Sequence, residues 1–130
     1  MNRNRTDNSS LVVGVDFDNT IATYDELLHR QAQERGLISK DVAKTKLEVR
    51  NTIRRLPEGE IQWQKLQGLV YGPMMKEAAT CEGVESFLKR CQQYRVKIFI
   101  VSHKTEFANY DVTRTNLRKA ALDWMVEKHF

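Results

Sequence analysis

The chain has 130 residues, of which 41% are hydrophobic and 29% are charged, and its formal net charge is +4. This length suits one domain with its own core, and the charge is too small to indicate a nucleic-acid partner by itself. The longest apolar runs, at residues 11–15 and 98–101, are too short to cross a bilayer, which favours a soluble cytoplasmic protein without a membrane partner.

Two apolar segments predict the strands of a parallel sheet. Residues 1–10 are polar and lack the apolar centre of a secretory signal, so we expect a disordered tail there. Residues 11–15 are short, apolar and rich in β-branched side chains, and they end at Asp16, as a buried parallel strand does. A second run of this kind covers residues 96–101 and ends at Ser102.

The residues between and after these strands mostly have helical spacing. Helices are predicted for residues 41–56, 60–71, 74–80, 84–91 and 113–128. The predicted order is strand, helical insert, helix, strand, helix, which is an α/β pattern. The insert, about residues 21–80, is long enough to form a lid over the strand ends.

Two carboxylates, Asp16 and Asp18, follow the first predicted strand one residue apart. The carboxyl ends of parallel strands are where such sheets bind ligands. Two acidic groups this close repel each other unless a cation or a shared proton offsets the charge. The pair therefore predicts a divalent metal, with one carboxylate that attacks and one that transfers protons. The alternative is a turn or capping pair after an ordinary strand.

Val-Asp-Phe-Asp-Asn-Thr at residues 15–20 resembles the first motif of the haloacid dehalogenase (HAD) superfamily, an apolar strand followed by Asp-x-Asp-x-Thr. Ile-Val-Ser at residues 100–102 is similar to its second motif, an apolar strand that ends in Ser or Thr. The resemblance covers about residues 11–128. It implies a Rossmannoid three-layer α/β sandwich with a parallel sheet and a small helical cap. The implied core is residues 11–20 and 81–130, and the implied cap is residues 21–80.

The resemblance also implies a Mg²⁺-dependent phosphohydrolase that acts on a small phosphorylated metabolite. Asp16 would be the nucleophile that forms an aspartyl-phosphate, with one carboxylate oxygen on Mg²⁺. Asp18 would be the general acid and base, with its backbone carbonyl on the metal. Thr20 would fix the active loop, and Ser102 would hydrogen-bond a phosphoryl oxygen. Asp18 points to phosphoryl transfer, because family members that displace halide lack an aspartate at this position.

Two later motifs of the family are not matched in the same way. Lys104, two residues after Ser102, is the best placed lysine for the third motif, which steadies negative charge. No acidic pair of the fourth motif follows a later strand, and two strands make an incomplete sheet. Three explanations stay open: a piece of a longer protein, a short member that completes its sheet as a homodimer, or a member without turnover.

Two other functions stay open. The first is a non-catalytic HAD-like domain that binds a phosphate ligand or a partner chain. The second is a nucleic-acid-binding module that uses the basic residues of one predicted helix, namely Lys44, Lys46, Arg50, Arg54 and Arg55. Such a run is more often the solvated face of a helix, so nucleic acid is the less favoured partner. Ser102 has a second reading as the N-cap of a following helix.

Overall fold

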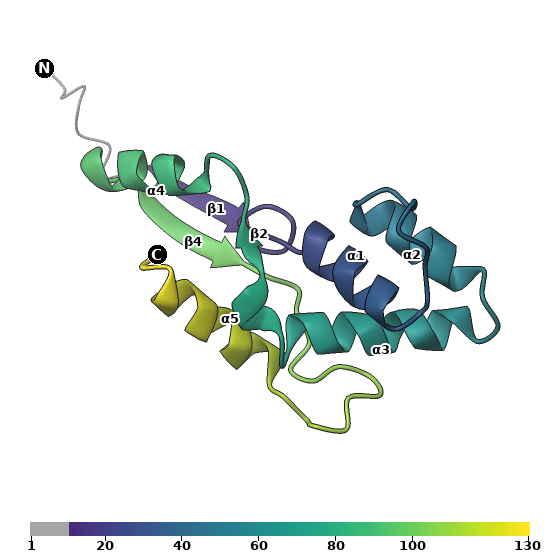
Figure 1. Cartoon of the computed structure of the whole chain (residues 1–130). Coiled ribbons are helices and arrows are strands. Elements are labelled where there is room, and N and C mark those ends of the chain that lie inside the picture. The colour runs from purple at the N-terminus through teal and green to yellow at the C-terminus, as the bar shows by residue number, and fades with distance from the viewer. Residues whose placement is uncertain (1–10) are drawn as a thin grey trace, which may run out of the picture. The chain divides into compact units, whose positions relative to one another are not determined.

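The structure is a computed structural model that describes residues 11–130, and the tail expected at residues 1–10 lies outside this range. The described part is a mixed α/β chain with five α-helices and a two-stranded parallel sheet (Figure 1). It divides into two compact units. Of the described residues, 11–23, 79–103 and 130 form the first unit, and 24–78 and 104–129 form the second.

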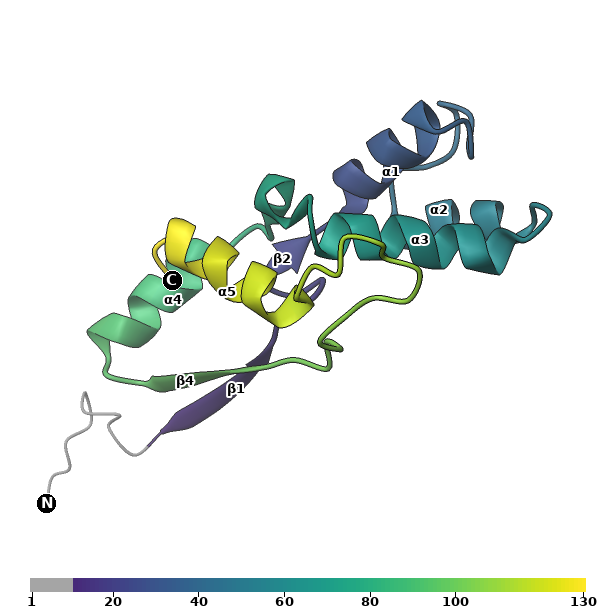
Figure 2. The same cartoon turned by 90° about the horizontal axis from the view of Figure 1, so that it is seen from below.

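The first unit contains the parallel sheet. Its elements are β1 (Val12–Asp16), β2 (Ala22–Thr23), β3 (Ala79–Thr80), α4 (Val84–Gln93) and β4 (Lys97–Val101). Strands β1 and β4 run side by side in parallel, as Figures 1 and 2 show, with Val12 opposite Lys97 and Asp16 opposite Val101. Strands β2 and β3 form a separate short antiparallel pair. The two apolar runs of the sequence therefore form the parallel pair that was predicted.

The two faces of the parallel sheet differ in exposure. Val13, Val15 and Ile98 are half-buried, and helix α4 packs on β4. The alternate side chains point to the other face because neighbouring residues of a strand face opposite ways. On that face Phe99 is 59% exposed and Val101 is 49% exposed. The sequence suggested a strand buried on both faces, and among the described residues only one face is partly covered.

The second unit is helical. Its elements are α1 (Asp25–Glu34), α2 (Lys46–Arg54), α3 (Gly59–Tyr71), the 3₁₀ helix η1 (Met75–Glu77) and α5 (Leu117–Glu127). Helices α1, α2 and α3 pack on one another, and their core contains Leu28, Val49, Ile53, Leu66 and Val70, all at most 2% exposed. The predicted insert thus contributes a helical bundle with its own apolar core.

Capping side chains decide where two of these helices begin. Helix α2 starts later than predicted because the Thr45 hydroxyl accepts a hydrogen bond from the Glu48 N–H at 3.2 Å, and the Asp25 carboxylate accepts one from the Lys46 N–H at 3.0 Å. Helix α5 also starts later than predicted, because the Asn116 side chain accepts a hydrogen bond from the Lys119 N–H at 3.0 Å.

The residues before α5 form a turn closed by Asp111. Its carboxylate accepts hydrogen bonds from the backbone N–H groups of Thr113, at 2.9 Å, and Thr115, at 3.0 Å. Burial alone would raise the pKa of Asp111, but the hydrogen bonds from these threonines outweigh it and lower the pKa. The carboxylate therefore stays charged at neutral pH. The turn that it closes takes the place of the first helical turn predicted from the sequence at residue 113.

Helix α5 packs on η1 and α3, and the Trp124 indole N–H donates a buried hydrogen bond to the Ala78 carbonyl at 3.0 Å. The sequence grouped residues 81–130 with the α/β core, whereas the compact units of the structure group residues 104–129 with the helical bundle. No helix among residues 11–130 has the length and apolar character needed to cross a membrane.

Candidate active site

The carboxyl ends of β1 and β4 form one edge of the sheet. Asp16 is the last residue of β1, and its backbone partner is Val101, the last residue of β4. Ser102 follows directly, so the register brings a carboxylate and a hydroxyl to the same edge. Both residues are exposed. No helix begins at Ser102, since the next helix in the described chain starts at Leu117, and the N-cap reading of this serine has no support.

A tight loop after β1 holds the rest of the motif. The Ile21 N–H donates to the Phe17 carbonyl at 2.9 Å, and the Asn19 N–H donates to the Ala22 carbonyl at 2.7 Å. Phe17 and Ile21 are each 1% exposed and anchor the loop in the apolar interior of the protein. Asn19 has a φ of +63°, a conformation that asparagine tolerates better than most residues.

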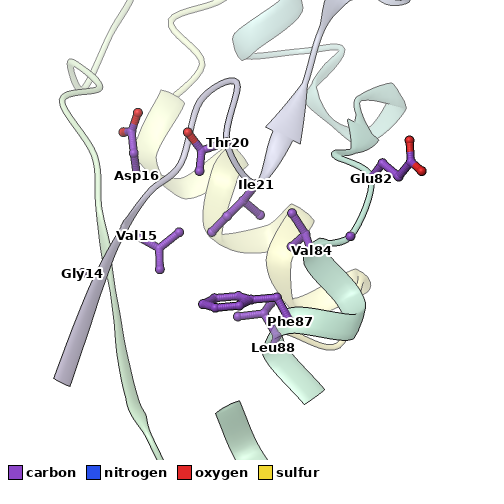
Figure 3. Close-up of a pocket in the computed structure, with 10 residues that line it drawn as sticks. Gly14, Val15, Asp16, Thr20, Ile21, Glu82, Val84, Phe87 and Leu88 are labelled. Atoms are coloured by element: carbon purple, nitrogen blue, oxygen red, sulfur yellow. The ribbon is translucent and has the colours of Figure 1, made fainter. Parts of the chain in front are cut away.

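Neighbouring side chains at the start of this loop differ in burial. Phe17 is buried, whereas its neighbours Asp16 and Asp18 are exposed and half-buried, as alternation along an extended segment requires. One oxygen of the Asp16 carboxylate accepts the Phe17 N–H at 2.9 Å, which orients the group and leaves the second oxygen for chemistry. In Figure 3 the Asp16 carboxylate and the Thr20 hydroxyl lie at the same end of the site.

A pocket of about 440 Å³ lies beside these residues, within the first unit. Its lining joins β1 to the start of α4 and is mostly apolar, with Val15, Ile21 and Phe87 turned toward it in Figure 3. This volume falls in the range of small-molecule sites. Glu82 also lines the pocket, across from Asp16 in Figure 3, and sequence reasoning missed it because it follows a strand of only two residues.

Asp16 and Asp18 are the acidic groups that the motif offers to a metal ion. Within residues 11–130 no set of three or more His, Cys, Asp or Glu side chains is close enough to hold one. Mg²⁺ needs fewer protein ligands, because it keeps several waters and is commonly bound through one or two carboxylates together with substrate phosphate. The residues present fit Mg²⁺ bound in this way, and they do not fit a metal enclosed by protein ligands alone.

Lys104 belongs to the second unit, whereas Asp16, Asp18, Thr20 and Ser102 all belong to the first. The Lys104 side chain is 8% exposed. Its ammonium lies 4.0 Å from the centre of the Tyr71 ring and 5.5 Å from that of Tyr24, a cation–π arrangement.

The basic residues of the helix α2 region also make contacts inside the second unit. The Lys46 ammonium donates to the Tyr71 hydroxyl at 2.9 Å, and the Arg54 guanidinium donates to the Glu60 carboxylate at 2.5 Å. These two side chains contact α3, although Arg54 stays exposed, as do Lys44 and Arg55.

The candidate site therefore consists of two aspartates, a threonine and a serine at one edge of a parallel sheet, next to a largely apolar pocket. Its local geometry has to carry the functional argument, because no protein-family model, curated protein or solved structure matches this chain.

Proposed function

We propose that this chain is a Mg²⁺-dependent phosphohydrolase with a HAD-like Rossmannoid core, which acts on a small phosphorylated metabolite through an aspartyl-phosphate. One observation carries the proposal. Asp16 stands exposed at the carboxyl end of β1, with Asp18 two residues on and Ser102 at the end of the paired strand. A cytoplasmic location and a homodimer that extends the sheet stay expectations from the sequence.

The proposed chemistry uses the two carboxylates in turn. The free oxygen of Asp16 attacks phosphorus and forms an acyl phosphate, while the ester oxygen leaves with a proton from Asp18. Asp18, now a carboxylate, then takes a proton from a water molecule as that water attacks the same phosphorus. The second step releases inorganic phosphate, restores the Asp16 carboxylate and reprotonates Asp18.

The remaining groups position the phosphoryl group. The Ser102 hydroxyl would donate a hydrogen bond to a phosphoryl oxygen, and Thr20 would keep the loop that carries Asp18 in place. When bound, Mg²⁺ supplies positive charge against the phosphoryl oxygens and the carboxylates. The apolar pocket beside Asp16 would accept the organic part of the substrate. The role of Lys104 as the stabilising cation stays a prediction.

Hydrolysis of p-nitrophenyl phosphate tests the proposal. We expect release of p-nitrophenol that depends on Mg²⁺, stops when EDTA removes the metal and returns when Mg²⁺ is added in excess. Phosphate binding without any turnover would favour the non-catalytic alternative. Turnover that is unchanged by EDTA would contradict a role for the metal.

A further inference from the structure

A second pocket, of about 290 Å³, lies wholly within the helical unit and is lined by α3, the end of α2 and the loop before α5. None of its lining residues belongs to the candidate active site, so an inference from it stands independently of the proposed phosphohydrolase. Its lining is more polar than that of the pocket beside Asp16, and three side-chain amides contribute to it, those of Gln64, Gln67 and Asn109.

Hydrogen bonds fix the orientation of these amides. The Asn109 amide N–H donates to the Gln64 carbonyl oxygen at 3.0 Å, and the Gln64 amide N–H donates to Glu60 at 3.2 Å. The Gln67 amide N–H donates to the Tyr71 hydroxyl at 3.3 Å. Each primary amide has two N–H groups and a carbonyl oxygen. These hydrogen bonds use one N–H each of Asn109 and Gln67, and they leave the carbonyl oxygen and the second N–H of both lining residues for a ligand.

The lining contains one positive and one negative side chain, Arg54 and Glu60, and they pair with each other. Arg54 donates two hydrogen bonds to Glu60, at 2.5 Å and 3.3 Å. The hydrogen bonds from Arg54 and Gln64 hold the pKa of Glu60 below its usual value, so this carboxylate is ionised at neutral pH. A lining with one paired cation and one paired anion favours a neutral ligand over a phosphate.

Aromatic side chains and a close backbone contact shape the walls. Trp63 is 2% exposed and lines the pocket together with Phe107, whose ring has the Arg114 guanidinium 4.8 Å from its centre. The loop before α5 lies directly on α3 at Gly68, where a Cβ would come within 2.7 Å of the Ala108 Cβ. The pocket therefore combines oriented amides with a smaller apolar surface that includes the exposed ring of Phe107.

We propose that this pocket binds a nucleobase. A side-chain amide offers an acceptor and a donor side by side, which is the pattern that pairs with the donor–acceptor edge of a base. The Phe107 ring, which is 38% exposed, adds apolar surface for a planar heterocycle. The cancelled charge makes the base, and not a phosphate, the part of a nucleoside or nucleotide that this pocket recognises.

Titration of the ¹⁵N-labelled full chain with free adenosine, cytidine and uridine tests this inference by NMR. These nucleosides carry no phosphate, so the result does not depend on any phosphatase activity. We expect at least one of them, at millimolar concentration, to shift the indole N–H signal of Trp63 in a saturable way and to leave the signal of Trp124 in place. Asn109→Ala should weaken this binding about tenfold.

Gln33→Ala, an exposed change on α1, is the matched control and should keep the wild-type affinity. An unchanged Trp124 signal in the Asn109 variant shows that the helical unit is still folded. The inference is wrong if no nucleoside moves the Trp63 signal, if Asn109→Ala binds as tightly as wild type, or if ribose shifts the same signals as strongly as the nucleosides do.

Discussion

Asp16→Asn is expected to reduce Mg²⁺-dependent hydrolysis of p-nitrophenyl phosphate by about a thousandfold or more. The reason is chemical: an amide oxygen is a poor nucleophile, and the change removes the negative charge that Asp16 would offer to the metal. The substitution keeps the size of the side chain, and it keeps an oxygen that can accept the Phe17 N–H. The fall should therefore appear in kcat without loss of the fold, which circular dichroism can check.

Glu85→Gln provides the matched control, because Glu85 is an exposed carboxylate in the same unit and its 3.7 Å ion pair with Lys89 is a surface contact. Its activity should equal that of the wild type. An Asp16→Asn protein that keeps most of its activity would show that another group attacks phosphorus, and the assignment of the nucleophile would be lost.

Gly59→Ala is expected to destabilise the helical unit severely. Gly59 is the first residue of α3, after the short turn from α2, and a Cβ there would overlap the Ile53 carbonyl oxygen and lie 2.7 Å from that of Arg54. Both contacts are with backbone, so no side-chain rotation relieves them. The helices would have to move apart, at an expected cost of about 3 kcal/mol in the free energy of unfolding. Urea unfolding measures this.

Gly36→Ala separates this steric cost from an ordinary loss of backbone freedom. Gly36 has a φ of +71°, but among the described residues, apart from Gly36 and its two chain neighbours, no heavy atom lies within 4 Å of the position that a Cβ would take there. We expect a loss of only about 1 kcal/mol from the left-handed conformation. If Gly59→Ala destabilised the protein no more than Gly36→Ala, the close packing of α2 on α3 would be contradicted.

The secondary structure that could be predicted from the sequence is the part set by local pattern. The apolar runs gave β1 and β4 within one residue at each end, because β-branched apolar runs bounded by polar residues leave few alternatives. Helix starts were less predictable. Helix α2 begins at Lys46 partly because Asp25, 21 residues earlier, accepts its N–H, and no local window contains that contact.

The candidate active site was likewise predictable only where its residues are close together in the sequence. Asp16 ends β1, and Asp18 and Thr20 lie in the short loop directly after it, so their grouping follows from the chain itself. Their proximity to the end of β4 depends on the parallel register, which the sequence could only suggest through the two apolar runs. The exposure of Phe99 was not predicted, because an apolar run does not reveal how many elements cover it.

The pocket of the helical unit could not have been predicted from one sequence. Gln64 and Asn109 lie 45 residues apart, and they meet only because the loop before α5 folds back onto α3. Its amides follow no catalytic or metal-ligand spacing, so they resemble ordinary surface residues. Chemistry carried by one loop can be inferred from a motif, whereas chemistry assembled from separate elements needs the fold.

Chemical trapping of the phosphorylated enzyme tests the central claim most directly. The chain would be mixed with a phosphate ester and Mg²⁺, quenched, reduced with borohydride, which converts an aspartyl-phosphate to homoserine, and digested for peptide mass spectrometry. The account predicts homoserine at position 16 and at no other aspartate. Reduction at a different aspartate, or hydrolysis of the ester with residue 16 always recovered as aspartate, would contradict it.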